Sequence, residues 1–196
     1  MAQTAQHRPI GTVDNEAQRV FQLQRAAYLR HPYPSHDERV EHLRALDHVL
    51  VDNRRAIAEA INADFGSRAF EESMIAELFT SVDGLRDVRK HLKKWMAPQK
   101  RHVSVLFATG HNRVIPMPKG VVGIVAPWNY PLFLTISPLT SALAAGNRVM
   151  IKMASNSQHL CRLLAEKVRA VLPEEVVAIL PGVRAQDFST LPYDHL

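Results

Sequence analysis

The sequence predicts an α/β protein in which an N-terminal helical layer and a β-hairpin precede a partial parallel β-sheet. Two patterns lead to this prediction. Apolar residues recur at helical spacing over residues 16–96, and short apolar strands alternate with helical segments from residue 119 onward. Two short extended runs between these regions are typical of a hairpin. We therefore expect a flexible tail at 1–15, a helical layer at 16–98, a hairpin at 99–118 and a sheet domain at 119–196.

The helical region contains recognisable start and stop signals. A first helix is expected over Glu16–His31, where two nearby prolines end it. Ser35 and Glu38 have the spacing of a capping box, which predicts that a second helix starts there. Its apolar face continues to Gly66, which suits a left-handed cap, with a candidate break near Asp52-Asn53.

A third helix is expected over Glu71–Met96. Its apolar residues should turn toward the core, namely Ile75, Leu78, Phe79, Val82, Leu85 and Leu92. The hairpin that follows is expected to pair Val103–Phe107 with Arg113–Met117 across a loop too long for a two-residue turn.

The last third of the chain has the order of a Rossmann-like βαβαβ unit. Its expected strands are Val121–Ala126, Arg148–Lys152 and Val176–Leu180, and its expected helices are Leu132–Ala145 and Ser157–Leu172. His195-Leu196 resembles the opening of a further strand. Such units commonly bind nucleotides at the carboxyl ends of their strands. No G-x-G-x-x-G follows the first strand, so a binding mode that depends on this fingerprint is excluded.

Composition and charge narrow the class of protein. Of 196 residues, 46% are hydrophobic and 22% are charged, which is ordinary for a soluble protein. The formal net charge is +5, and basic residues crowd into Arg86–Arg101. No nucleic-acid-binding motif accompanies them, so we interpret this stretch as a solvated helix end and expect no nucleic-acid partner.

Cysteine content and hydropathy bear on the compartment. The single cysteine, Cys161, excludes an internal disulfide, and the amino terminus lacks the pattern of a secretory signal. No apolar stretch approaches the roughly 20 residues that cross a bilayer, so no membrane segment is expected within this chain. The ten histidines lack metal-ligand spacing, and no metal site is expected. These features predict a cytoplasmic protein.

The segment after the first strand carries an unusual asparagine. Asn129 lies between Pro127 and Pro131 and beside Trp128, on a turn that the prolines stiffen. A rigid amide donor of this kind suits the stabilisation of a developing oxyanion. The alternative is that Asn129 is the N-cap of the next helix.

Several segments together resemble one family. Pro118–Leu132, Ala144–Val149 and Ile151-Lys152 closely resemble the cofactor-domain signature of aldehyde dehydrogenases. Upstream segments resemble the branch that includes coniferyl aldehyde dehydrogenases, namely Asp64–Arg68, Glu72-Ser73, Ala76-Glu77 and His91–Met96. The resemblance covers residues from about 35 to 196, an N-terminal portion of the family's sequence, and implies a partial dinucleotide-binding domain.

The resemblance implies roles for individual residues. Asn129 would donate to the oxyanion that forms during catalysis. The cofactor, NAD or NADP, would lie along Val125, Ala126, Pro127, Trp128 and Asn129, with Lys152 at the adenosine ribose or its phosphate and Gly182 allowing close backbone approach. Ser155 replaces the family's usual glutamate. A neutral residue there would relax the preference or favour NADP, or else the site has decayed.

The implied activity is oxidation of an aldehyde, with coniferyl-type aromatic aldehydes suggested by the branch, to a carboxylic acid. A cysteine thiolate attacks the carbonyl, hydride passes to the nicotinamide, and water hydrolyses the thioester. The resemblance places the nucleophilic cysteine and the general-base glutamate beyond Leu196, so we expect this chain to be inactive alone. Cys161 lies in a helix among leucines and is interpreted as a packing residue.

Two hypotheses follow for the chain. It is a truncated portion of an NAD(P)-dependent aldehyde dehydrogenase that takes a small-molecule aldehyde. Alternatively, it is an inactive remnant that acts only as a binding or oligomerisation module. The hairpin resembles the family's oligomerisation strands, which predicts a homodimer for the complete protein.

Overall fold

The computed structural model describes residues 16–196, and the predicted tail at 1–15 lies outside this range. The helical region contains α1 (Glu16–Arg30), α2 (His36–Asp52), α3 (Arg54–Phe65), α4 (Phe70–Glu72), the π-helix η1 (Ser73–Phe79) and α5 (Thr80–Met96). The rest contains β1 (Gln99–Arg101), the 3-10 turn η2 (Val105–Phe107), β2 (Asn112–Val114), β3 (Val121–Ala126), α6 (Phe133–Ala144), β4 (Arg148–Met153), α7 (Gln158–Arg169), β5 (Val177–Ile179) and α8 (Ala185–Ser189).

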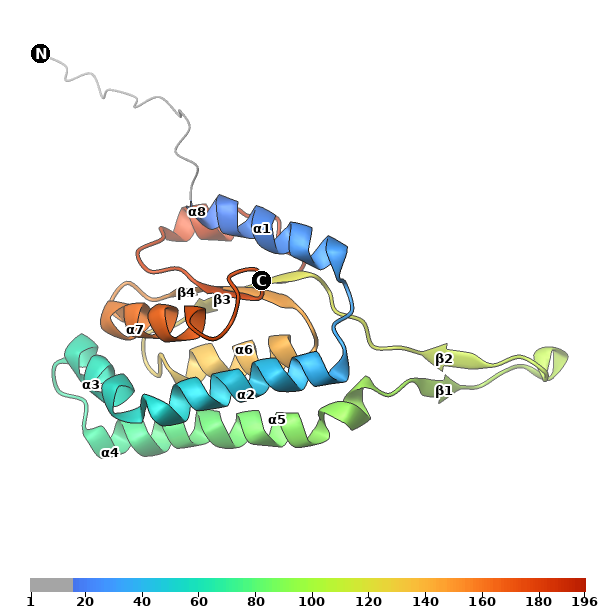
Figure 1. Cartoon of the computed structure of the whole chain (residues 1–196), viewed down its shortest axis with the longest axis horizontal. Helices are drawn as coiled ribbons and strands as arrows, with labels where there is room; N and C mark the ends of the chain where they lie inside the picture. Colours follow the sequence, from blue (N-terminus) through green and yellow to red (C-terminus); the bar gives the residue numbers. More distant parts are fainter. Residues whose placement is uncertain (1–15) are drawn as a thin grey trace, which may run out of the picture.

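Helices cover both faces of the parallel sheet. In Figure 1, α1 and α8 lie over one face, while α6 and α7 lie against the other, with α2 and α5 beyond α6. The core is accordingly divided. One cluster joins Val20 and Phe21 of α1 to Met150 of the sheet and to Phe188 of α8. The larger cluster fills the space between the sheet and the remaining helices.

The sheet confirms the predicted α/β class and the βαβαβ succession along the chain. β3 pairs in parallel with β4, and β4 pairs in parallel with β5. On the free edge of β3, His195 forms a parallel bridge with Val122, and the Gly123 amide donates to the His195 carbonyl at 2.9 Å. At the position where the sequence predicts the opening of a further strand, the structure shows a single bridge outside the named strands.

The helix signals in the sequence are confirmed. The Glu38 amide donates to the Ser35 hydroxyl at 3.2 Å, and the Ser35 amide donates to the Glu38 carboxylate at 2.7 Å. The break near Asp52-Asn53 separates α2 from α3. Gly66 ends α3 with φ of 79°, a left-handed conformation that favours glycine.

The prediction of which residues of the third helix face the core was partly wrong. Leu78 and Leu85 are buried as expected, but Ile75 and Phe79 are 68% and 65% exposed. The reason is η1, whose π-helical turns hold more residues than α-helical ones and so rotate the side chains away from the expected stripe. Glu77 takes the buried position instead.

The hairpin forms, but its first strand was predicted at the wrong residues. β1 (Gln99–Arg101) pairs antiparallel with β2 (Asn112–Val114), whereas the predicted arm Val103–Phe107 contains the turn η2. All six paired residues and the apolar tip are exposed. Because no core selects one face, the apolar pattern could not fix the strand. Figure 1 shows the hairpin projecting from the body.

Candidate functional site

Three strand ends meet at the carboxyl edge of the sheet. β3 leads into Pro127–Pro131, β4 leads into Ala154–Ser157, and β5 leads into Leu180–Gly182. Because the three strands are parallel neighbours, these connections lie at one edge. The residues predicted to contact a cofactor are brought to this edge, namely Val125, Ala126, Pro127, Trp128, Asn129, Lys152, Ser155 and Gly182.

The exposure of the predicted residues differs along β3 and its loop. Val125 and Trp128 are 53% and 59% exposed, and Pro127 and Asn129 are also exposed. Ala126 is buried at 1% exposure and faces the core. A ligand at this edge could therefore contact Ala126 through its backbone only.

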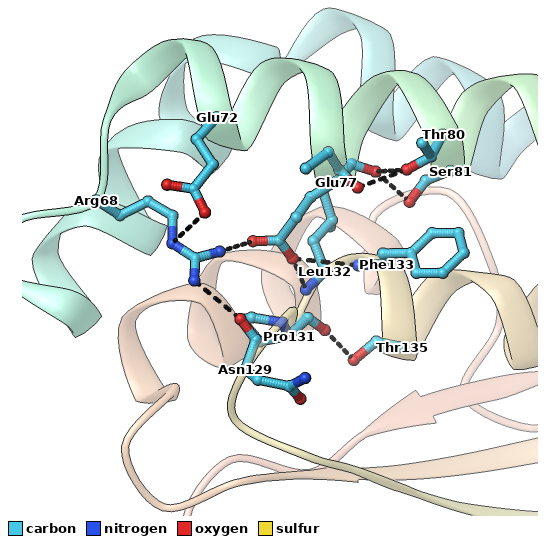
Figure 2. Close-up of polar contacts among 11 residues, drawn as sticks. Arg68, Glu72, Glu77, Thr80, Ser81, Asn129, Pro131, Leu132, Phe133 and Thr135 are labelled. Carbon is cyan, nitrogen blue, oxygen red and sulfur yellow. Dashed lines mark hydrogen bonds and ion pairs between the residues drawn. The ribbon is translucent and has the colours of Figure 1, made fainter.

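Asn129 presents a free amide on an anchored backbone. Among residues 16–196, no group forms a hydrogen bond with its side chain, while its carbonyl accepts from Arg68 Nη2 at 2.9 Å. In Figure 2 the Asn129 amide points away from Arg68 and Glu77. The N-cap alternative is wrong, because α6 begins at Phe133 and Leu132 holds the N-cap position.

Glu77 supplies the cap that Asn129 does not. Its Oε2 accepts from the amides of Leu132 at 2.7 Å and Phe133 at 3.3 Å, and its side chain is fully buried. These amides belong to the first turn of α6, where donors lack partners within the helix and the helix dipole favours a negative charge. Glu77 thus fixes the start of α6 from the π-helix η1.

Arg68 joins Glu77 to the Asn129 loop, as Figure 2 shows. Its Nη1 lies 3.1 Å from Glu77 Oε1, and its Nη2 donates to the Asn129 carbonyl. The guanidinium also lies over the rings of Phe65 and Tyr130, at 4.0 and 5.0 Å from their centroids. Such stacking favours arginine over lysine at this position.

The electrostatics of Glu77 reflect competing effects. Burial raises the pKa of the Glu77 carboxyl, while the Leu132 and Phe133 amides and the Arg68 charge lower it in part. The net effect is a raised pKa, because the hydrogen bonds and the Arg68 charge offset the cost of burial only in part. Sequence reasoning assigned no role to Glu77 or Arg68. The one signal was a carboxylate among the apolar residues of the third predicted helix.

A second connection links the ends of β4 and β5. Gln158 Nε2 donates to the Ala154 carbonyl at 2.9 Å, and Gln158 Oε1 accepts from the Gly182 amide at 3.1 Å. Gly182 has φ of 73° and open space beside it, so the backbone there is accessible. Sequence reasoning did not predict this role for Gln158. Gly182 is 24 residues away in the sequence, and Ala154 lies before the helix that Gln158 begins.

Lys152 and Ser155 occupy the β4 end. Lys152 is half-buried and its Nζ donates to the Met153 carbonyl at 3.2 Å, while Ser155 is exposed. The start of α7 is held nearby by Asp64, whose carboxylate accepts from the His159 and Leu160 amides at 2.9 and 3.0 Å. At the end of β4 this edge therefore carries the Lys152 ammonium and the exposed Ser155 hydroxyl.

Cys161 is a packing residue, as predicted. It is fully buried in α7, and burial raises the pKa of its thiol to about 11. Because the thiolate is the nucleophilic form, Cys161 is unreactive near neutral pH. Within residues 16–196 no group of three or more metal-binding side chains is found, and no helix is long and apolar enough to cross a membrane.

Solved structures share this fold. The chain matches Staphylococcus aureus AldH in a substrate-bound state with a TM-score of 0.84 at 23% identity, covering 90% of this chain and 39% of that one. It also matches the indole-3-acetaldehyde dehydrogenase AldA of P. syringae in complex with NAD+, with a TM-score of 0.74 at 22% identity, covering 85% and 33%. These likenesses establish an aldehyde dehydrogenase fold.

The family profile described as "Aldehyde dehydrogenase family" matches residues 5–191, and the chain therefore belongs to the aldehyde dehydrogenase family. A Pseudomonas aeruginosa protein named "Probable coniferyl aldehyde dehydrogenase" is 45% identical over 184 residues, covering 93% of this chain and 39% of its own length. The coniferyl aldehyde dehydrogenase of a Pseudomonas species is 39% identical over 150 residues, covering 76% and 31%. The chain spans less than half the length of these relatives.

Proposed function

We propose that this chain provides the oxyanion donor and part of the cofactor-binding edge of an NAD(P)-dependent aldehyde dehydrogenase that oxidises coniferyl-type aromatic aldehydes to carboxylic acids. The observation that carries this proposal is Asn129. Its amide is free and exposed at the sheet edge, while its backbone is held by Arg68. A donor whose backbone is fixed needs little reorganisation when charge develops on the substrate oxygen.

The residues at the sheet edge fit a dinucleotide in part. Gly182 lets a ligand approach the backbone, and Ser155 offers a hydroxyl where a carboxylate would repel a 2′-phosphate. Lys152 offers an ammonium for ribose hydroxyls or a phosphate. We infer that the site takes NAD or NADP, with Ser155 favouring NADP. When bound, the cofactor accepts the hydride that leaves the substrate.

Cofactor binding is testable on the chain by isothermal titration calorimetry with NAD and NADP. We expect saturable binding, with NADP at least as tight as NAD. Ser155→Glu should weaken NADP selectively, because it places a carboxylate near the 2′-phosphate. The matched control is Asn156→Glu, which adds the same charge to the neighbouring exposed position. Equal loss of both cofactors in both variants would contradict the assigned role of Ser155.

Substrate oxidation needs a thiolate that Cys161 does not provide. The decisive measurement is the intact mass of the protein recovered from its native cells, together with an assay for reduced cofactor using coniferyl aldehyde. A mass well above 22.0 kDa with activity supports the proposal. A mass of 22.0 kDa without activity overturns it as a catalytic assignment.

A second candidate function is oligomerisation without catalysis. It is favoured by the exposed apolar tip of the hairpin, where Val105, Leu106 and Phe107 are 88%, 89% and 69% exposed. Exposed apolar patches of this kind commonly mark protein contacts. We propose that the complete protein is a cytoplasmic homodimer that uses this hairpin.

A further inference from the structure

A polar cavity lies at the edge of the sheet opposite to the candidate site. It has a volume of about 240 Å³ and is bounded by the end of α1, the start of α2 and the amino ends of β4 and β5. Arg148 is the first residue of β4, so the cavity lies far along the strands from the edge described above. Its charged or titratable lining residues are Arg30, His31, Glu38, His42, Arg148 and Glu175.

Arg148 is the unusual member of this set. Arg148 is buried, with 6% of its surface exposed. Among residues 16–196, however, its guanidinium forms no hydrogen bond or ion pair. Its Nε is buried and has no hydrogen-bond partner in the part of the chain that the structure describes. An arginine keeps its charge in proteins, and a buried charge without a partner is costly. The charges of Glu175 and Glu38 stabilise this cation from a distance, while burial lowers the pKa of its guanidinium overall. Arg148 therefore faces the cavity without a direct anionic partner among the described residues.

The two carboxylates of the cavity already have partners. Glu38 accepts from the Ser35 amide at 2.7 Å and lies 3.1 Å from His31, while Glu175 lies 3.0 Å from Arg30. Neither forms a hydrogen bond with Arg148. His42 is half-buried on the same cavity and also has no partner in the described chain. The two side chains of the cavity that lack a hydrogen-bond partner in the described chain are therefore Arg148 and His42, and both can donate hydrogen bonds to an anion.

We propose that Arg148 and His42 bind a small tetrahedral oxyanion, such as phosphate or sulfate, in this cavity. The guanidinium fork matches two oxygens of such an anion, and a protonated imidazole can donate to a third. The cavity is smaller than the roughly 300–1,000 Å³ of pockets that hold drug-sized ligands, so a compact ion fits it better than a nucleotide. The site is independent of the proposed dehydrogenase function.

The occupancy of this site should depend on pH through His42. Burial and then the Arg148 charge lower the pKa of His42, while Glu38 and Glu41 of the same helix raise it in part. Arg30 and His31 of α1 and Glu175 before β5 also line the cavity. A bound anion favours protonated His42, so binding should tighten as the pH falls through the histidine pKa.

The test is calorimetric titration of sulfate into the 196-residue protein at low ionic strength. Sulfate is used because its charge does not change between about pH 5.5 and pH 8, on either side of the ordinary histidine pKa of about 6.5. We expect saturable binding that is tighter at the acid pH. His42→Gln should abolish this pH dependence while retaining the binding seen at about pH 8.

Arg148→Met should weaken sulfate binding by roughly tenfold or more, because it removes the positive charge and the guanidinium N–H groups that would bind two sulfate oxygens. The matched control is Arg162→Met, an exposed arginine on α7, which should bind like the wild type. Equal weakening in both variants, or no saturable binding by the folded wild type, overturns the proposal. If Arg148→Met does not fold by circular dichroism, Arg148→Lys replaces it. That variant keeps the charge but loses the fork, and wild-type affinity in it also overturns the proposal.

Discussion

At the sheet edge, one side chain is available for a ligand while its neighbours hold the structure together. Asn129 contributes its carbonyl to the protein and leaves its amide free. Glu77 and Arg68 have the opposite character, since both side chains are committed to internal contacts. The amide is thus available for a ligand because other residues carry the structural role.

The free amide leads to a prediction about stability. Asn129→Ala should change the free energy of unfolding by less than about 0.5 kcal/mol, because the exposed side chain has no hydrogen-bond partner to lose within residues 16–196. Urea denaturation followed by circular dichroism measures this. A loss of about 1 kcal/mol or more would instead indicate the capping role that the sequence allowed.

Glu77 should be far more sensitive. Glu77→Gln removes a buried charge that pairs with Arg68 and accepts from two amides, and we expect a loss of about 3–5 kcal/mol in the free energy of unfolding. Glu72→Gln is the matched control, because Glu72 lies 3.6 Å from the same arginine but its side chain is 45% exposed. It should cost about 0–1 kcal/mol. Similar losses in both would refute the assigned role of Glu77.

At the scale of elements, η1 brings Glu77 and α6 together. A regular α-helix over Ser73–Phe79 would place side chains in a different phase, and Glu77 owes its buried position to the wider turns. The apolar spacing of the third helix could not reveal this, because it assumes α-helical rotation throughout. The buried strands were predicted to within one or two residues, since burial on both faces gives each strand a mostly apolar centre.

Other elements left no such signal. The strands of the hairpin are exposed, so β1 has no apolar pattern that marks it as a strand, whereas the turn that follows it is apolar. The sequence placed Asn129, Lys152, Ser155 and Gly182 at strand ends that meet at one edge, although their roles stay predictions. Arg68 and Gln158 were not predicted, because each acts on backbone groups of another element, and a single sequence does not state which elements will meet.

Turns between elements provide a paired prediction. Gly66 and Gly146 both have positive φ, at 79° and 86°, but a Cβ on Gly146 would lie 2.7 Å from Arg39 Cζ, whereas one on Gly66 would meet nothing. Gly66→Ala should cost about 1–2 kcal/mol from backbone conformation. Gly146→Ala should cost about 1–3 kcal/mol more, because Arg39 is packed there. Equal losses in urea denaturation would contradict the crowding at Gly146.

At the scale of the whole molecule, the projecting hairpin should govern association. Leu106→Asp places a charge at a side chain that is 89% exposed, so it should shift a dimer toward monomer without lowering the thermal stability of the monomer. Sedimentation velocity measures the shift. Asp83→Asn on α5 serves as the control for a charge change elsewhere on the surface. Unchanged association in Leu106→Asp would remove the hairpin tip from the proposed interface.

The bridge between Val122 and His195 has a consequence for where ligands gather. From β3 the chain moves outward through β4 to β5, and it then returns to the other side of β3. β3 is therefore the point at which the order of strands reverses, and the connections on its two sides leave in opposite directions. In open α/β sheets such a reversal opens a crevice beyond the carboxyl end of the central strand. Here the loop at that position carries Asn129.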